Sequence, residues 1–218
     1  MKCEATLVAL TQPVIGIPAA SAEAFIAYCA RVSNPSNQDN PDYKGLLNYC
    51  IRNKHWSVFE MADAIVEVKA PRDITRQLLR HRSFSFQEFS QRYSDEIEFT
   101  DREFRRQDTK NRQNSIDDLS DEQRNEAEGA AWHLKDLAKD YYKAMRSPEF
   151  NVAKECARVI LPEGLTMSTL YVKGSLRSWL HYLEVRDDPG VTQWEHVILA
   201  RAIREALLPA FPTILKKE

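Results

Sequence analysis

The stretch AIVEVKAPRDITRQLLRHRSFSFQEFSQRY occupies residues 64–93 and carries a strand, a helix and an unusual polar and aromatic segment in succession. Its first part alternates apolar residues with more polar neighbours, at Ala64, Val66 and Val68. A period of two is typical of a β-strand, and Pro71 marks its end. Because proline is tolerated in the first turn of a helix, Pro71 can also open a helix that continues through Leu79.

On both sides of residues 64–93, the chain alternates further strands and helices. The same pattern predicts strands over Cys3–Leu10 and Met167–Val172. Helical spacing and capping residues predict helices after Ser21, over residues 43–51, after a capping box at Ser120 and Gln123, over Asn151–Leu161, after Ser175, and after a second capping box at Thr192 and Glu195. This order, without an internal repeat or boundary, predicts one α+β domain over residues 1–218, with helices flanking a small sheet.

Composition and charge exclude several classes of protein. Of the 218 residues, 43% are hydrophobic and 28% are charged, which is ordinary for a globular domain. The formal net charge is -2, whereas a protein bound mainly to a nucleic-acid backbone is usually distinctly basic. We find no membrane-spanning run and no signal-peptide pattern, so we expect the cytoplasm, of a microbial cell or of the host of a virus.

Cysteine and histidine usage gives no sign of a disulfide framework or a metal site. The cysteines are Cys3, Cys29, Cys50 and Cys156, and none form a C-x-x-C pair. We expect free thiols in a reducing compartment. The histidines show no ligand spacing, so no metal is expected. Residues 100–118 are dense in charge and amide, and we expect an exposed excursion there.

Arginines gather between residues 72 and 92, opposed only by Asp73 and Glu88. The guanidinium group is a planar fork of donors that suits phosphate and carboxylate. Arg72, Arg76 and Arg80 are spaced to share one helix face, and for the first two a solvated basic face is the simpler interpretation.

The segment after Arg80 interleaves aromatic residues with serine, glutamine, glutamate and arginine, at Phe84, Phe86, Phe89 and Tyr93. A solvated face would not carry so many aromatic side chains. A core strand would not carry so many polar groups in need of partners. Apolar walls with a few placed donors are typical of a ligand site.

Residues 80–93, RHRSFSFQEFSQRY, closely resemble the signature R-H-R-x-x-S-x-N-E-x-S-x-R-Y of flavin-dependent thymidylate synthases. Only Gln87 departs from it, and glutamine keeps the amide of the usual asparagine. Further segments resemble that family in the same order and at similar spacing: Ala30–Ser33, His55–Glu60, Ala157–Pro162, Leu183–Arg186 and Gln193–Glu195. The resemblance covers nearly the whole chain.

This resemblance implies both a fold and a reaction. The fold is a mainly antiparallel sheet flanked by helices. The reaction is reductive methylation of dUMP to dTMP, with 5,10-methylenetetrahydrofolate as carbon donor, FAD and NADPH as the reducing system, and tetrahydrofolate released. A homotetramer with active sites shared between subunits is implied, with no nucleic-acid or membrane partner.

Site residues also follow from the resemblance. Those expected to bind dUMP are Gln77, Arg80, Glu88, Phe89, Ser90, Gln91, Arg92, Arg158 and Arg186. Those expected to bind FAD are Ser57, Arg80, His81, Arg82, Glu88, Ser175, Leu176, Arg177 and His181, the last in place of an asparagine. The expected catalytic residues are Arg186, which would polarise the uracil ring at N3, and His55, on the folate and nicotinamide side of the flavin.

Other interpretations stay open from the residues themselves. Without the resemblance, a surface ion pair with Glu155 or nearby acids is the better interpretation of Arg158, and a plain helix cap is the better interpretation of Ser175. Ser90 lacks an obvious base for a nucleophilic role, and Cys156 follows Glu155 rather than a proline, so we expect it to pack. A nucleic-acid-binding module and a flavoprotein without synthase activity are the rival functions.

Overall fold

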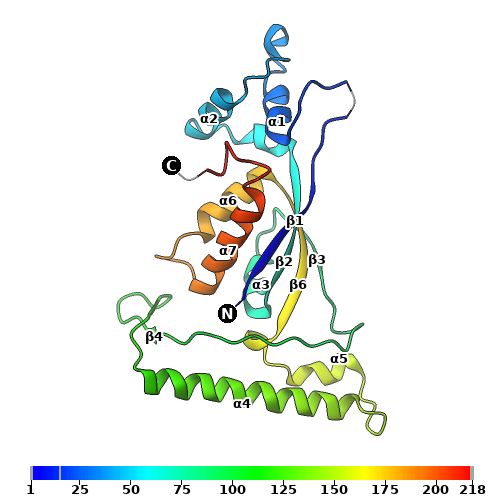
Figure 1. Ribbon diagram of the computed structural model, residues 1–218, viewed down its shortest axis with the longest axis vertical. Coiled ribbons are helices and arrows are strands. Elements are labelled where there is room, and N and C mark those ends of the chain that lie inside the picture. The colour runs from blue at the N-terminus through cyan, green and yellow to red at the C-terminus, as the bar shows by residue number, and fades with distance from the viewer. Residues whose placement is uncertain (1, 15, 217–218) are drawn as a thin grey trace.

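Figure 1 shows the computed structural model, which describes residues 2–14 and 16–216. Four strands form one sheet in the order β1-β2-β6-β3, and every neighbouring pair is antiparallel. The strands are β1 (Glu4–Leu10), β2 (Asp63–Pro71), β3 (Ser85–Glu88) and β6 (Met167–Ser175). A separate two-stranded ribbon pairs β4 (Arg106–Gln107) with β5 (Ser115–Ile116). The predicted α+β class, with a small antiparallel sheet, is confirmed.

Helices lie on one face of the sheet and at its two ends. In Figure 1, α6 and α7 cover one face, α1 and α2 lie at one end, and the long α4 runs across the other. The helices are α1 (Ala22–Ala30), α2 (Lys44–Arg52), α3 (Arg72–Leu78), α4 (Asp121–Arg146), α5 (Lys154–Ala157), α6 (Leu176–Arg186) and α7 (Trp194–Leu207). Short 3-10 turns span Pro35–Asn37, Trp56–Met61, Arg158–Ile160 and Glu163–Leu165. No described helix is long and apolar enough to cross a membrane.

The core is the inner face of the two central strands packed against α6. Val66 pairs with Val172 across β2 and β6, and both side chains are fully buried. Phe84 of the signature packs on Trp179 of α6, with ring centroids 4.4 Å apart. A Cβ atom at Gly174 would lie 2.3 Å from the Phe84 ring, so this position requires glycine. Phe84 thus anchors residues 80–93 to the core.

The passage from β2 into α3 occurs as the sequence indicates. Pro71 is the last residue of the strand and the N-cap of the helix. The helix ends at Leu78, so Arg80 lies beyond it, and the expectation of three arginines on one helix face is wrong. Arg72 is also not solvated: its side chain is 17% exposed and lies 3.5 Å from Glu88.

The polar and aromatic segment contains a strand that the sequence analysis did not predict. Residues Ser85–Glu88 form β3, which pairs with β6 at the edge of the sheet. Ser85 and Gln87 are exposed, whereas Phe86 and Glu88 are half-buried on the opposite side. An edge strand can direct polar side chains to water, which a core strand cannot.

Three of the predicted helix caps are confirmed and the second capping box is wrong. Both hydrogen bonds of the Ser120–Gln123 capping box form, and Ser21 and Ser175 cap their helices. The second capping box is wrong, because Thr192 donates to the carbonyl of Val185 and α7 has no side-chain cap. The helix expected over residues 151–161 begins only at Lys154 and continues as a 3-10 turn.

Residues 100–118 are only in part an exposed excursion. The side chains of Arg102 and Arg105 are each 12% exposed. Arg102 forms a bidentate pair with Asp73, at 3.1 Å for each contact, and Arg105 pairs with Glu195 of α7. These ion pairs fasten the segment to the body of the protein, so residues 100–118 combine exposed side chains with two arginines that are largely buried.

Candidate active site

Two elements distant in sequence meet where the signature begins. The Nε of Arg186, at the end of α6, donates a hydrogen bond to the Nε2 of His81 at 2.9 Å. The His81 ring also meets the Tyr182 ring edge-on, with centroids 5.1 Å apart. Burial lowers the pKa of His81 to about 4, and the nearby Arg186, His181 and Arg80 add to this effect. His81 is therefore neutral at pH 7.

The arginines around His81 lack acidic partners. Among the described residues, Arg80, Arg82 and Arg186 form no ion pair, whereas Arg177 bonds to Glu60 at 3.0 Å. Burial lowers the pKa of Arg186, and Arg80 acts in the same direction. Arg80 and Arg186 therefore both bring positive charge close to His81. An anionic ligand with several acceptor oxygens would satisfy them.

A cavity of about 600 Å³ lies between α6 and the 3-10 turn Trp56–Met61. Its walls include Trp56, Ser83, Arg177 and His181. The hydroxyl of Ser178 reaches the carbonyl of Ser83 at 3.5 Å and so joins the signature to α6. Two of the residues expected to hold FAD, Arg177 and His181, thus face one cavity.

The remaining residues expected near FAD or folate differ in exposure. Ser57 and His55 are exposed at the start of the same turn, and the His55 ring lies edge-on to Tyr49 at 5.6 Å. Ser175 caps α6. The side chain of Leu176 is fully buried in the core, so a contact with FAD at this position would fall to its backbone.

The second part of the signature lies at the other end of β3, beside α5. Glu88 accepts a hydrogen bond from Ser168 at 2.8 Å. Arg92 lies 3.4 Å from Glu155, so the alternative ion pair between Glu155 and Arg158 does not form. Arg158 has no ion pair within the described part of the chain.

The residues that follow Glu88 in the signature are mostly buried or half-buried. Gln91 is 6% exposed, and Phe89 and Ser90 are half-buried. The Ser90 hydroxyl accepts a hydrogen bond from the Arg92 backbone at 3.3 Å, and no described histidine bonds to it. Cys156 is exposed, so its predicted packing role is wrong.

The residues expected to bind dUMP therefore form two separate groups. Gln77, Arg80 and Arg186 belong to the first, and the second comprises residues 88–92 and Arg158. No hydrogen bond or ion pair among residues 2–14 and 16–216 links the two.

Sequence reasoning missed a buried histidine next to Gln77. His196 is fully buried, and its Nδ1 lies 3.2 Å from the Oε1 of Gln77. Its Nε2 lies 3.1 Å from the Tyr182 hydroxyl. Burial lowers the pKa of His196 to about 3, with Arg186 and His81 contributing. The only signal was its position directly after the Gln193–Glu195 segment.

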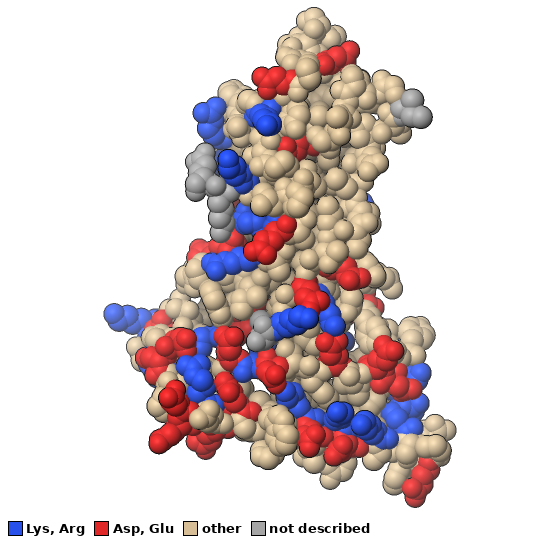
Figure 2. All heavy atoms as spheres, viewed as in Figure 1, with Lys and Arg blue, Asp and Glu red and all other residues tan. Residues whose placement is uncertain are grey.

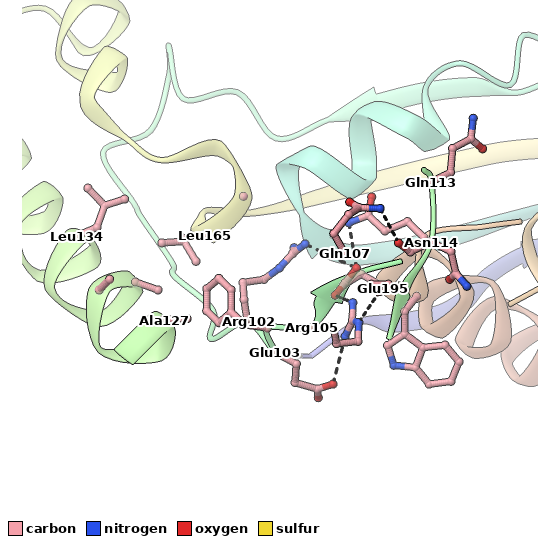
Figure 3. Close-up of a pocket in the computed structure, with 17 residues that line it drawn as sticks. Arg102, Glu103, Arg105, Gln107, Gln113, Asn114, Ala127, Leu134, Leu165 and Glu195 are labelled. Atoms are coloured by element: carbon pink, nitrogen blue, oxygen red, sulfur yellow. Dashed lines mark hydrogen bonds and ion pairs between the residues drawn. The ribbon is translucent and has the colours of Figure 1, made fainter. Parts of the chain in front are cut away.

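Figure 3 shows the residues that line a larger cavity, of about 720 Å³. Its walls come from residues 102–115, from α4, from Gly164 and Leu165, and from Gln193–Glu195. None of its lining residues belongs to residues 80–93, so we place the chemistry at the unpaired arginines instead. The face of the molecule in Figure 2 mixes positive and negative side chains over α4. That face offers no broad basic track for a nucleic acid.

The fold is an α+β architecture, and the arginines that lack an ion pair among the described residues are suited to an anionic ligand. Residues 17–213 match the family described as thymidylate synthase complementing protein. The chain is 50% identical over 212 residues to a flavin-dependent thymidylate synthase of Synechocystis sp., covering 95% of each chain. It is 46% identical over 219 residues to a probable flavin-dependent thymidylate synthase of Paramecium bursaria Chlorella virus 1, covering 97% of each. The chain belongs to the family of flavin-dependent thymidylate synthases.

A solved structure shares the fold. The UMP/dUMP methylase PolB from Streptomyces cacaoi, bound with 5-Br dUMP, superposes with a TM-score of 0.77. The match covers 98% of this chain and 93% of that one, at 24% sequence identity. At that identity the likeness establishes the architecture alone.

Proposed function

We propose that this protein methylates dUMP to dTMP, with FAD as redox cofactor, 5,10-methylenetetrahydrofolate as carbon donor and NADPH as reductant. The observation that carries this proposal is a set of arginines without an acidic partner among the described residues, Arg80, Arg82, Arg158 and Arg186, in a chain of net charge -2. FAD, dUMP and NADPH carry phosphates and the folate carries carboxylates, and arginine forks suit both groups. Identity of 46% and 50% to relatives that bear this enzyme name supports it.

The residues around the 600 Å³ cavity fit FAD. Arg80 and Arg82 would neutralise its phosphates, while Arg177 and His181 would line its walls beside the capped N-terminus of α6. When bound, FAD supplies the transfer of reducing equivalents from NADPH, which no side chain of this protein can perform.

Arg186 would act on the pyrimidine. Its Nε donates to His81, so the guanidinium is held in one orientation, and its terminal nitrogens have no hydrogen-bond partner among the described residues. A fixed cation beside the uracil ring would stabilise negative charge as C5 becomes nucleophilic. His55 is exposed, and we assign it to the open side of the site, in contact with folate or nicotinamide.

We further propose a homotetramer in which each active site combines the two groups from different chains. The surface of α4 supports this assembly. Leu134, Leu137 and Tyr141 share one helix face by their spacing and are 47%, 54% and 58% exposed. Apolar side chains clustered in this way are typical of protein interfaces. A cytoplasmic location belongs to the same proposal.

The test is formation of dTMP by the purified, FAD-loaded protein from dUMP, methylenetetrahydrofolate and NADPH. We expect product only when all three are supplied. A protein that holds FAD and dUMP but makes no dTMP would be a flavoprotein without synthase activity. Tight, salt-dependent binding of single-stranded DNA or RNA in place of dUMP would favour the nucleic-acid module.

A further inference from the structure

A run of hydrogen bonds leads from residues 100–118 to Gln77. Arg105 donates to one oxygen of the Glu195 carboxylate, and Figure 3 shows these two side chains at the wall of the larger cavity. The Nε2 of Gln193 donates to the other oxygen at 2.9 Å. The Nε2 of Gln77 in turn donates to the Oε1 of Gln193 at 2.7 Å. The run continues from Gln77 through His196 to Tyr182.

The direction of every bond in this run follows from one charge. An ionised carboxylate only accepts, so Gln193 must present its nitrogen to Glu195 and its oxygen to Gln77. Gln77 must then present its own nitrogen to Gln193 and its oxygen to His196. Because the Oε1 of Gln77 can only accept, the Nδ1 of His196 must carry the proton and donate to it. The Nε2 of the neutral ring then accepts from the hydroxyl of Tyr182.

The Glu195 carboxylate, whose charge sets these directions, is buried and paired with arginine. The Glu195 side chain is 4% exposed. Burial opposes its ionisation, but hydrogen bonds from Arg105 and Gln193 outweigh burial and hold the pKa of Glu195 below its usual range. Arg102 lies 3.9 Å away and adds a second positive charge. A buried carboxylate held ionised in this way imposes its polarity on its neighbours.

We propose that Glu195, kept ionised by Arg105, is a positioning residue that fixes the amide of Gln77 for the nucleotide. This inference rests on the proposed role of Gln77 in binding dUMP. The Gln77 amide donates one N–H to Gln193 and accepts from His196 with one lone pair of its oxygen. One N–H and one lone pair are then left for a ligand. If the Gln77 amide flipped by 180°, the N–H and the oxygen presented to the ligand would exchange places. Residues 100–118 would then contribute to substrate binding through Arg105 without touching the substrate.

The first test uses the resting protein without substrates. Nitrogen NMR of ¹⁵N-histidine-labelled protein at neutral pH, assigned with His196→Gln, should show a neutral His196 ring with its proton on Nδ1. In Glu195→Gln the side chain at 195 can donate as well as accept, so the tautomers of His196 should become mixed. A wild-type ring protonated on Nε2 would overturn the proposal.

The second test measures the Kd for dUMP by calorimetry on FAD-loaded protein. Glu195→Gln and Gln193→Leu should each weaken dUMP binding by about tenfold, the factor that one hydrogen bond commonly contributes, with FAD content retained. Gln193→Leu breaks the run without removing a charge, so it stands in if Glu195→Gln fails to fold. Arg105→Lys keeps the charge and should lose less affinity than Arg105→Met.

Arg106→Ala is the matched control, because it breaks the exposed ion pair with Asp118 in the same segment. Its Kd should equal that of the wild type. An unchanged Kd in folded Gln193→Leu and Glu195→Gln would overturn the positioning role. If the wild type binds no dUMP at all, the proposed function fails, and the NMR result separates that failure from a failure of the hydrogen-bond direction.

Discussion

Arg186 donates a hydrogen bond to His81 across a separation of 105 residues, at 2.9 Å. The contact ties the first residues of the signature to the end of α6. An imidazolium ring has no lone pair on nitrogen, so the bond exists only while His81 is neutral. His81 therefore contributes no charge to this region at pH 7, and the orientation of the Arg186 guanidinium depends on a neutral neighbour.

A first prediction concerns pH and stability. The pKa of His81 is about 4 in the folded protein and its ordinary value is 6.5, so the unfolded chain binds protons more readily between these values. Stability is thus retained above pH 6.5 and lost as the pH falls toward 4. His81→Gln should flatten this fall in melting temperature, measured from pH 7.5 to 4.5. Exposed His133→Gln is the control, and parallel curves for His81→Gln and wild type would contradict the prediction.

Arg186→Ala tests the role of the fixed cation. Turnover should fall on the order of a hundredfold, because one positioned charge at the uracil ring would be lost. FAD content should stay close to that of the wild type, since other residues line the flavin cavity. Arg112→Ala, which removes an exposed arginine without an ion pair among the described residues, should leave turnover unchanged. A kcat within a few-fold of wild type in Arg186→Ala would show that the role is wrong.

Bound FAD is the third prediction. The purified protein should be yellow and should release FAD when denatured. Arg80→Ala and Arg82→Ala should each weaken FAD binding by about tenfold or more, because a hydrogen bond to a charged group is lost in each. Fluorescence titration of the apoprotein measures the effect. A colourless wild-type protein that also fails to take up added FAD would refute the flavin site.

The assembly can be tested at α4. Leu137→Glu places a charge on the exposed apolar face and should convert the tetramer into smaller species, with loss of dTMP formation. Lys143→Glu changes an exposed residue off that apolar stripe and should leave the assembly intact. Light scattering of the FAD-loaded proteins gives the mass directly. An active wild-type monomer would rule out sites shared between chains.

Cys156 provides a test against the thymidylate synthases that use a cysteine nucleophile. Its side chain is exposed, and Arg158 lies two residues further along the chain. Residues two apart point to different sides of a helix, so Arg158 need not touch the thiol. Cys156→Ala should therefore retain NADPH-dependent formation of dTMP. Abolished turnover with dUMP binding intact would mean that a thiol attacks the pyrimidine.

Local patterns in the sequence determined most of the secondary structure. The alternation of Ala64, Val66 and Val68 indicated β2, and the caps at Ser21, Ser120 and Ser175 placed three helix starts. These features depend on residues no more than a few positions apart, so they can be read without knowing the fold. The signature likewise indicated the family, because its residues are contiguous.

The tertiary structure decided which side chains meet. His196 contacts Gln77 across 119 residues, and Arg105 pairs with Glu195 across 90. In the sequence, Glu195 had the spacing of a capping residue for α7. In the fold, a carboxylate buried at that place needs a cation, and Arg105 supplies it. Local propensity cannot specify such partners, since the free energy of a buried charge depends on groups that only the folded chain brings together.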